Sequence, residues 1–124
     1  MNRTIGITAA AFGATAVMLG AFGAHALRAR IDDAALQTWH TAVEYQFWHT
    51  LALLALAAFP VPSPRSARLS ALAFSVGIVL FSGSLYALAL GAPRWTGTIT
   101  PFGGAALIAG WVLLGCACCG AARR

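Results

Sequence analysis

The chain has few charged side chains and no lysine. Charged residues make up 9% of its 124 residues and hydrophobic residues 60%, whereas soluble domains carry about 25% charged residues. So little polar surface does not support a water-soluble fold, and we expect lipid to be the outer solvent of a single domain over residues 1–124. The basic residues are all arginines that lie between apolar runs rather than in one stripe. This pattern argues against nucleic-acid binding.

Cysteine and reaction motifs are also scarce. Cys116, Cys118 and Cys119 crowd near the C-terminus without a Cys-x-x-Cys pair, so we predict free thiols that are buried or close to the membrane edge. The sequence contains no Gly-x-Ser-x-Gly, no phosphate-binding loop and no His-Glu-x-x-His. Catalysis therefore has no support from motif spacing, and we expect neither an enzyme nor a bound cofactor or metal ion.

Four long apolar runs fill most of the chain. A hydrocarbon core about 30 Å thick requires about 20 residues of helix, and every amide inside it must be paired within the span. We predict an all-α transmembrane four-helix bundle with spans at about 5–27, 40–59, 69–90 and 102–119. A polar lead-in extends the second helix to about 33–59, with Asp32 or Asp33 as its cap. Ala24-His25-Ala26 is similar to a secretory cleavage site, but the apolar run before it is long for a signal peptide, so we expect a retained helix.

Arginine positions predict the orientation in the membrane. Five arginines fall on the side of the termini and the central loop, and three on the other side: Arg3, Arg65, Arg68, Arg123 and Arg124 against Arg28, Arg30 and Arg94. Positive charge is enriched in cytoplasmic loops. We therefore expect both termini in the cytoplasm.

Small residues follow one face of the first apolar run and recur in the third and fourth. Lipid tails are as apolar as leucine, so close contact through small residues has to contribute to helix association. The glycines expected at helix contacts are Gly6, Gly13, Gly20, Gly23, Gly77, Gly103 and Gly110. Packing is one interpretation of this pattern, and a ligand groove along the glycines is the alternative.

Polar side chains inside the apolar runs are predicted to meet at one membrane face. Ionisable residues are costly in lipid and are therefore candidates for function. With four alternating spans, two helix ends and two helix starts share the extracytoplasmic side. The candidate polar cluster there comprises His25, His40, Glu44, His49, Ser82, Ser84, Tyr86, Arg94, Thr98 and Thr100.

Several interpretations of this cluster stay open. In a structural clasp, Glu44 pairs with a histidine or with Arg94, and hydroxyls satisfy loop amides. In a functional pocket, Glu44 and the histidines accept protons near neutral pH at the edge of a low-dielectric region. Axial haem ligation by His25 and His49 is a third interpretation. Metal binding by His25, His40, Glu44 and His49 is a fourth, although no metal-binding spacing motif supports it.

Four blocks near these residues carry a resemblance. GAFGAHAL at 20–27, TAVEYQFWH at 41–49, SGSLYALAL at 82–90 and ITPFGG at 99–104 occur in the expected order. Together they resemble the YgdD-like family of small inner-membrane proteins, domain of unknown function 423, to which transmembrane protein 256 of animals is similar. The resemblance covers nearly the whole chain and implies a multi-pass protein of the bacterial inner membrane without an established activity. It adds Gln46 to the candidate polar cluster, and Pro101 also matches a motif position.

The leading functional hypothesis is a non-enzymatic accessory or scaffolding protein that packs in the lipid bilayer against a larger membrane complex or against itself. A second hypothesis is a small-molecule, lipid or proton-handling membrane protein that uses the extracytoplasmic polar cluster. A haem or metal carrier is the third.

Overall fold

The computed structural model describes residues 2–120, and every regular element in this part of the chain is helical. The helices are α1 (Arg3–Phe22) with the short π-helix η1 (Gly23–Leu27), α2 (Asp33–Ala58), α3 (Pro64–Ala89), the 3₁₀-helix η2 (Arg94–Thr98) and α4 (Ile99–Cys119). The prediction of an all-α fold is confirmed. Arg123 and Arg124, which contributed to the predicted orientation, lie outside the described residues.

Side-chain caps explain where two helices begin. The Asp32 carboxylate accepts a hydrogen bond from the Ala35 amide at 2.8 Å, so α2 starts at Asp33 and includes the predicted polar lead-in. Ser63 caps α3, and Pro64 occupies the first helical position, where a missing amide hydrogen is harmless. For this reason α3 begins five residues before the apolar run that starts at position 69.

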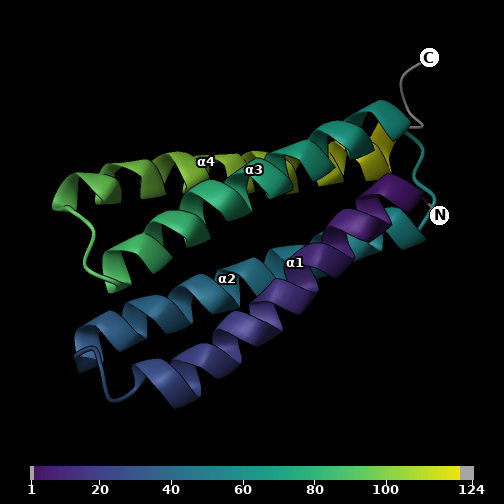
Figure 1. Ribbon diagram of the computed structural model, residues 1–124. Coiled ribbons are helices and arrows are strands. Elements are labelled where there is room, and N and C mark those ends of the chain that lie inside the picture. Colours follow the sequence, from purple (N-terminus) through teal and green to yellow (C-terminus); the bar gives the residue numbers. More distant parts are fainter. Residues whose placement is uncertain (1, 121–124) are drawn as a thin grey trace.

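The four helices form two antiparallel hairpins (Figure 1). Helix α1 packs on α2, α2 on α3, and α3 on α4, and the α3–α4 pairing is the most extensive. Both ends of the described chain and the α2–α3 loop lie at one end of the molecule, which we call the terminal end. The two short turns lie at the other, which we call the turn end. Gly91 in the second turn has a φ of 96°, a conformation that favours glycine.

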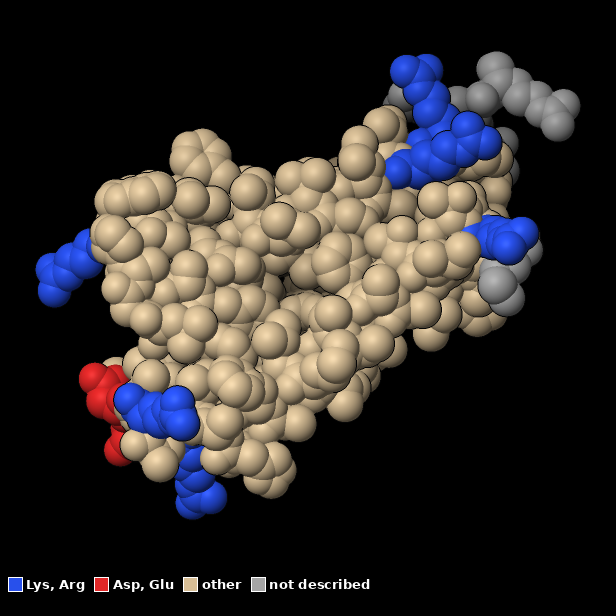
Figure 2. All heavy atoms as spheres, in the orientation of Figure 1, with Lys and Arg blue, Asp and Glu red and all other residues tan. Residues whose placement is uncertain are grey.

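Three segments in the described part of the chain are long and apolar enough to cross a membrane: Arg3–Leu27, Pro64–Ala89 and Arg94–Cys119. Helix α2 is long enough, at 26 residues or about 39 Å, but polar side chains such as Glu44, Gln46 and His49 lower its hydropathy. Membrane crossing by α2 therefore stays a prediction. Figure 2 shows charged side chains at both ends of the molecule and an uncharged surface between them on the face in view.

Two apolar clusters form the interior. The larger contains the fully buried Leu53 and Phe74 together with Ile78 and Leu107. The smaller lies at the turn end around Leu27, Trp39 and Ala89. A layer of hydrogen-bonded polar side chains separates the two clusters along α2, and it contains part of the predicted polar cluster.

Candidate functional site

Gln46 is the centre of this polar layer. Its side chain is 3% exposed. The amide nitrogen Nε2 donates to the carbonyl oxygen of Phe12 at 2.9 Å and to Oγ1 of Thr15 at 2.8 Å. The amide oxygen Oε1 accepts a hydrogen bond from the Tyr86 hydroxyl at 2.7 Å. One buried amide therefore connects α1, α2 and α3.

Two further bonds join α2 to its neighbours beside Gln46. The Trp39 indole nitrogen donates to the carbonyl oxygen of Leu19 in α1 at 2.9 Å, and its ring packs against Tyr86 with centroids 4.6 Å apart. The Ser82 hydroxyl of α3 donates to the carbonyl oxygen of Ala42 at 2.7 Å. Positions 39, 42 and 46 share one face of a helix, so α2 presents a continuous polar seam.

The hairpin of α3 and α4 has its own polar contacts. The hydroxyls of Ser84 and Thr100 lie 2.6 Å apart near the turn end. Nearer the terminal end, the Ser70 hydroxyl donates to the carbonyl oxygen of Gly110 at 2.7 Å. These bonds join neighbouring helices.

His49 is enclosed by aromatic rings. It is 6% exposed, and its ring centroid lies 5.6 Å from that of Phe74 and 5.9 Å from those of Tyr45 and Trp111. Its Nδ1 lies 2.6 Å from the carbonyl oxygen of Tyr45. A carbonyl only accepts, so Nδ1 carries the hydrogen of this bond.

The remaining members of the predicted cluster do not join this layer. His25, Glu44, Arg94 and Thr98 are exposed, and His40 is half-buried. The Thr98 hydroxyl donates locally to the carbonyl oxygen of Trp95. The structure therefore divides the predicted cluster into a bonded interior group and a set of side chains that are exposed or half-buried, most of them charged or titratable.

The described residues offer no ready cofactor ligand set. No group of three or more histidine, cysteine, aspartate or glutamate side chains is placed to hold a metal ion within residues 2–120. His25 lies in η1, whose Gly23 contacts Trp39, and His49 follows Trp39 by ten residues, or about 15 Å of helix rise. The two histidines therefore lie at different levels of the bundle. Cys116, Cys118 and Cys119 are free and exposed.

The glycines singled out in the sequence have different surroundings. A Cβ added at Gly77 would lie about 2.5 Å from the side chain of Leu107, and one added at Gly110 would lie about as close to that of Phe74. A Cβ added at Gly103 would meet the backbone of Phe81. At Gly23 the neighbour is the Trp39 indole. At Gly13 and Gly20 the nearest atoms are side-chain methyls 3.4 Å away, and Gly6 is half-buried.

Every buried side-chain nitrogen and oxygen in the described part of the chain has a hydrogen-bond partner. Unpaired polar groups are expensive in lipid, so the interior layer acts as structural bonding between helices. The residues left for external chemistry are the exposed ones, Glu44 above all, because it is an ionisable group within a helix of the bundle.

Some residues of this layer were missed by the sequence analysis. Neither Thr15 nor Trp39 was among the residues of the predicted polar cluster. Both have a usable signal. Trp39 and Gln46 are seven residues apart on one helix face, and Thr15 lies in the run of small residues that this face meets.

A chain of four helices with apolar outer faces and a bonded polar interior is a small helical membrane protein.

Residues 19–104 match a family described as a protein of unknown function (DUF423), and the chain belongs to this family. It is 45% identical over 101 residues to UPF0382 membrane protein YwdK of Bacillus subtilis, covering 80% of this chain and 82% of that protein. It is 42% identical over 117 residues to UPF0382 inner membrane protein YgdD of Escherichia coli, covering 91% and 87%. A UPF0382 membrane protein of Haemophilus influenzae is 46% identical over 98 residues, or 79% of each chain. No solved structure matches the chain.

Proposed function

We propose that this protein crosses the bacterial inner membrane four times, with both termini in the cytoplasm, and acts as a non-enzymatic accessory subunit of a larger membrane complex. The observation that carries this proposal is Glu44, an exposed carboxylate on α2, the helix that we propose as the second of the four spans. It lies 11 residues into α2, about 16 Å from the start of the helix. Ionisable residues in membrane helices are paired or face water. A partner protein would supply that pairing.

The surroundings of Glu44 support a docking surface. Phe47, Trp48 and Leu51 follow it on the same face of α2 and are 41%, 51% and 49% exposed. This spacing of three and four residues forms one stripe along a helix. Aromatic side chains are enriched at protein interfaces. The Glu44 stripe (Glu44, Phe47, Trp48 and Leu51) therefore combines an apolar contact surface with one charge that selects a partner.

The chemistry of the stripe favours a different protein over a second copy. A symmetric dimer formed through this stripe places two Glu44 carboxylates near its axis, and like charges in a low-dielectric region repel. We therefore infer that the partner is a membrane helix with a basic or hydroxyl side chain at the level of Glu44. Self-association is the alternative outcome of the test.

Purification from native membranes in a mild detergent tests this proposal. We expect the wild-type chain to elute with a second protein, well above the 12.8 kDa of one chain. Glu44→Leu is expected to release that partner. The matched control is Gln37→Leu, which removes an exposed polar group from the lead-in of the same helix and should keep the partner. Elution of the wild type as a lone monomer, or a Glu44→Leu variant that retains its partner, contradicts the proposal.

A second candidate function, proton or small-molecule handling, is favoured by the i, i+4 placement of His40 and Glu44 on one helix face. Glu44→Gln separates the two candidates because it keeps the shape of the side chain but cannot release a proton. Where the wild-type gene rescues a deletion phenotype, the accessory role predicts that Glu44→Gln fails to rescue it only if the variant also loses its partner. Loss of rescue with an intact complex supports proton handling instead.

A further inference from the structure

A groove runs along the outside of the bundle between α1 and α3, away from the Glu44 stripe. Its central hollow has a volume of about 530 Å³ and is lined by Asn2, Thr8, Arg68 and Ser75, with Leu53 of α2 among its lining residues. An inner hollow of about 310 Å³ shares Thr8 and Ser75 and extends to Phe12, Val79 and Leu80. We call the two hollows together the α1–α3 groove. Figure 2 shows the surface hollowed between the two hairpins.

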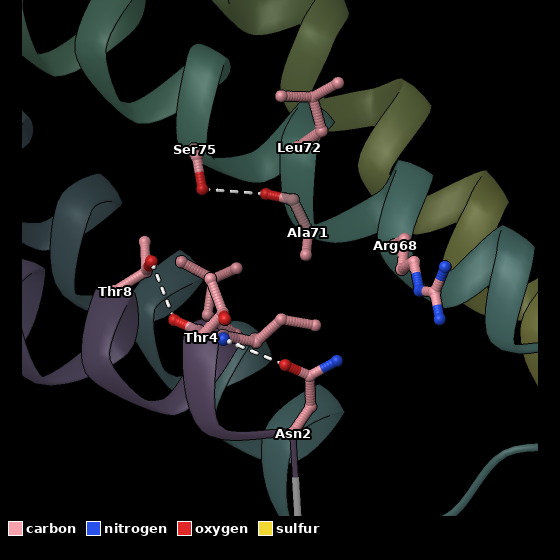
Figure 3. A pocket seen from close by; sticks show the side chains of 9 residues that line it. Asn2, Thr4, Thr8, Arg68, Ala71, Leu72 and Ser75 are labelled. Atoms are coloured by element: carbon pink, nitrogen blue, oxygen red, sulfur yellow. Dashed lines mark hydrogen bonds between the residues drawn. The ribbon is translucent and has the colours of Figure 1, made fainter.

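The groove changes from polar to apolar along its length. Arg68 and Asn2 lie at one end, and Thr8 and Ser75 lie further in (Figure 3). The hydroxyls of Thr8 and Ser75 donate to the carbonyl oxygens of Thr4 and Ala71 in their own helices, at 3.0 and 2.8 Å. These donors are therefore occupied. The inner hollow is then completed by Phe12, Val76, Val79 and Leu80.

The polar end of the groove offers hydrogen-bond donors. Arg68 is exposed, and its guanidinium carries donors in a fork that matches phosphate oxygens. The Asn2 side-chain oxygen accepts from the Ile5 amide at 3.2 Å, which leaves the NH₂ group of Asn2 to donate outward. This end therefore suits an anion with several oxygen acceptors.

The charge distribution along the chain strengthens this match. Arg3, Arg65 and Arg68 lie at the terminal end, where α1 and α3 begin. The chain has three acidic residues. Asp32 and Asp33 lie at the opposite end, where α2 begins. Glu44 precedes the groove residue Leu53 by nine residues, or two and a half turns, so Glu44 is on the opposite face of α2 from the groove. The groove thus opens in a region of positive charge.

The length of the groove matches one leaflet of a bilayer. Arg68 and Val79 are eleven residues apart on α3, which corresponds to about 16 Å of rise. Half of a hydrocarbon core that is about 30 Å thick is about 15 Å. With Arg68 at the headgroup level, Val79 and Leu80 therefore lie near the middle of the membrane. The central hollow also falls within the range of about 300–1,000 Å³ typical of ligand sites.

From these observations we propose that the α1–α3 groove binds an anionic phospholipid. One acyl chain lies along the groove from Thr8 and Ser75 to Val79, and the phosphate accepts hydrogen bonds from Arg68 and Asn2. The leaflet is the one at the terminal end, which is cytoplasmic in the proposed orientation and rich in anionic lipid. This site is independent of the accessory role, because it uses a different face of the molecule.

Native mass spectrometry tests the headgroup part of the proposal. The purified wild-type chain is incubated with equal amounts of phosphatidylglycerol and phosphatidylcholine that carry the same acyl chains. We expect phosphatidylglycerol to be retained preferentially and Arg68→Gln to reduce that preference roughly tenfold, the size of effect typical of lost bonds to a charged group. Arg65→Gln removes an exposed arginine that does not line the groove and should keep the preference.

A second pair of variants tests the acyl-chain part. Thr8→Phe places a ring inside the groove and is expected to lower the binding of both lipids by severalfold. Ile7→Phe adds the same ring at a neighbouring position that is 61% exposed and does not line the groove, so it should bind lipid like the wild type. Thermal unfolding of each variant checks that it is folded.

Three results would overturn the proposal. The first is equal retention of the two lipids by the wild-type chain, which needs no variant. The second is an unchanged preference in Arg68→Gln, or equal lipid binding by Thr8→Phe and Ile7→Phe. The third is displacement of phosphatidylglycerol by millimolar inorganic phosphate, which would make the site one for free phosphate. None of these results depends on Glu44 or on co-purification of a partner.

Discussion

The two hairpins of this protein are joined by different kinds of contact. In the α3–α4 hairpin, glycines allow close approach, because Gly103 lies against the backbone of Phe81 and Gly77 against Leu107. In the α1–α2 hairpin, Gly13 and Gly20 make only ordinary contacts with side-chain methyls, 3.4 Å from the position of a Cβ. There, buried side chains bond across the interface.

The α1–α2 hairpin relies on hydrogen bonds to exposed carbonyl oxygens. Gln46 donates to the carbonyl oxygen of Phe12 and Trp39 to that of Leu19. Small residues in α1 leave these carbonyls accessible to α2. A run of glycine and alanine therefore serves mainly close packing in the α3–α4 hairpin, where Ser70 also reaches the carbonyl oxygen of Gly110, and mainly access to the backbone in the α1–α2 hairpin.

Gly103→Ala should produce the largest effect and tests the α3–α4 half of this comparison. The new methyl group would collide with the backbone of Phe81 and Leu80, which cannot move without separating the helices. Overpacking costs up to about 3 kcal/mol, offset by about 1 kcal/mol from the better helix propensity of alanine. We expect a loss of about 2 kcal/mol in the free energy of unfolding, measured by denaturant titration in micelles.

The matched control is Gly13→Ala in the other hairpin. Its methyl group would meet Thr50 at an ordinary contact distance, so the variant should lose no stability and should gain up to about 1 kcal/mol from helix propensity. If the two glycine variants lose equal stability, the contrast between the hairpins is wrong.

Gln46→Leu is expected to have the next largest effect and tests the α1–α2 half. It removes bonds to Phe12, Thr15 and Tyr86. Inter-helix hydrogen bonds in membranes average about 0.6 kcal/mol each, so the loss of three should cost about 1.8 kcal/mol in the same titration. Tyr86→Phe removes only one of these bonds and should lose less. An equal loss in both variants would show that Gln46 does not connect three helices.

Ser84→Ala should produce the smallest effect, because close packing dominates the α3–α4 hairpin. It removes the 2.6 Å contact with Thr100, worth about 0.6 kcal/mol. Ser75→Ala is the control, since the Ser75 hydroxyl bonds only within its own helix and should be neutral. A double-mutant cycle of Ser84→Ala with Thr100→Val measures the coupling. A coupling larger than the effect of Gln46→Leu would reverse the ranking of the two hairpins.

Much of the helical arrangement was predictable from the sequence. Apolar runs predict helices by length, and Asp32 predicts the start of α2 through its cap. The start of α3 was predicted too late, because hydropathy does not detect the cap by Ser63 or the proline that follows it. The apolar run at 40–59 also led to a predicted span in α2, although α2 is not among the three segments that are long and apolar enough to cross a membrane.

The candidate site was predictable only in part. Alternation of spans predicts that polar side chains of the third span lie beside the second, and in the structure Ser82 and Tyr86 of α3 donate to Ala42 and Gln46 of α2. Gln46 entered the predicted cluster only through the family resemblance. Alternation does not determine which side of a helix turns inward, and so it does not distinguish buried Gln46 from exposed Glu44. The α1–α3 groove was not predictable, because it depends on which helices are left without contact.

The last turn of α2 and the α2–α3 loop that follows it are bonded to α4 and to the residue that precedes α1. The amide of Asn2 donates to the carbonyl oxygen of Ala57, and the amide of Ser63 donates to that of Ala117 in the last turns of α4. During synthesis, a chain inserted only as far as α3 lacks the acceptor for Ser63. The loop is therefore completed only after the final helix arrives, so shortening α4 by even one turn should loosen a junction formed some fifty residues earlier.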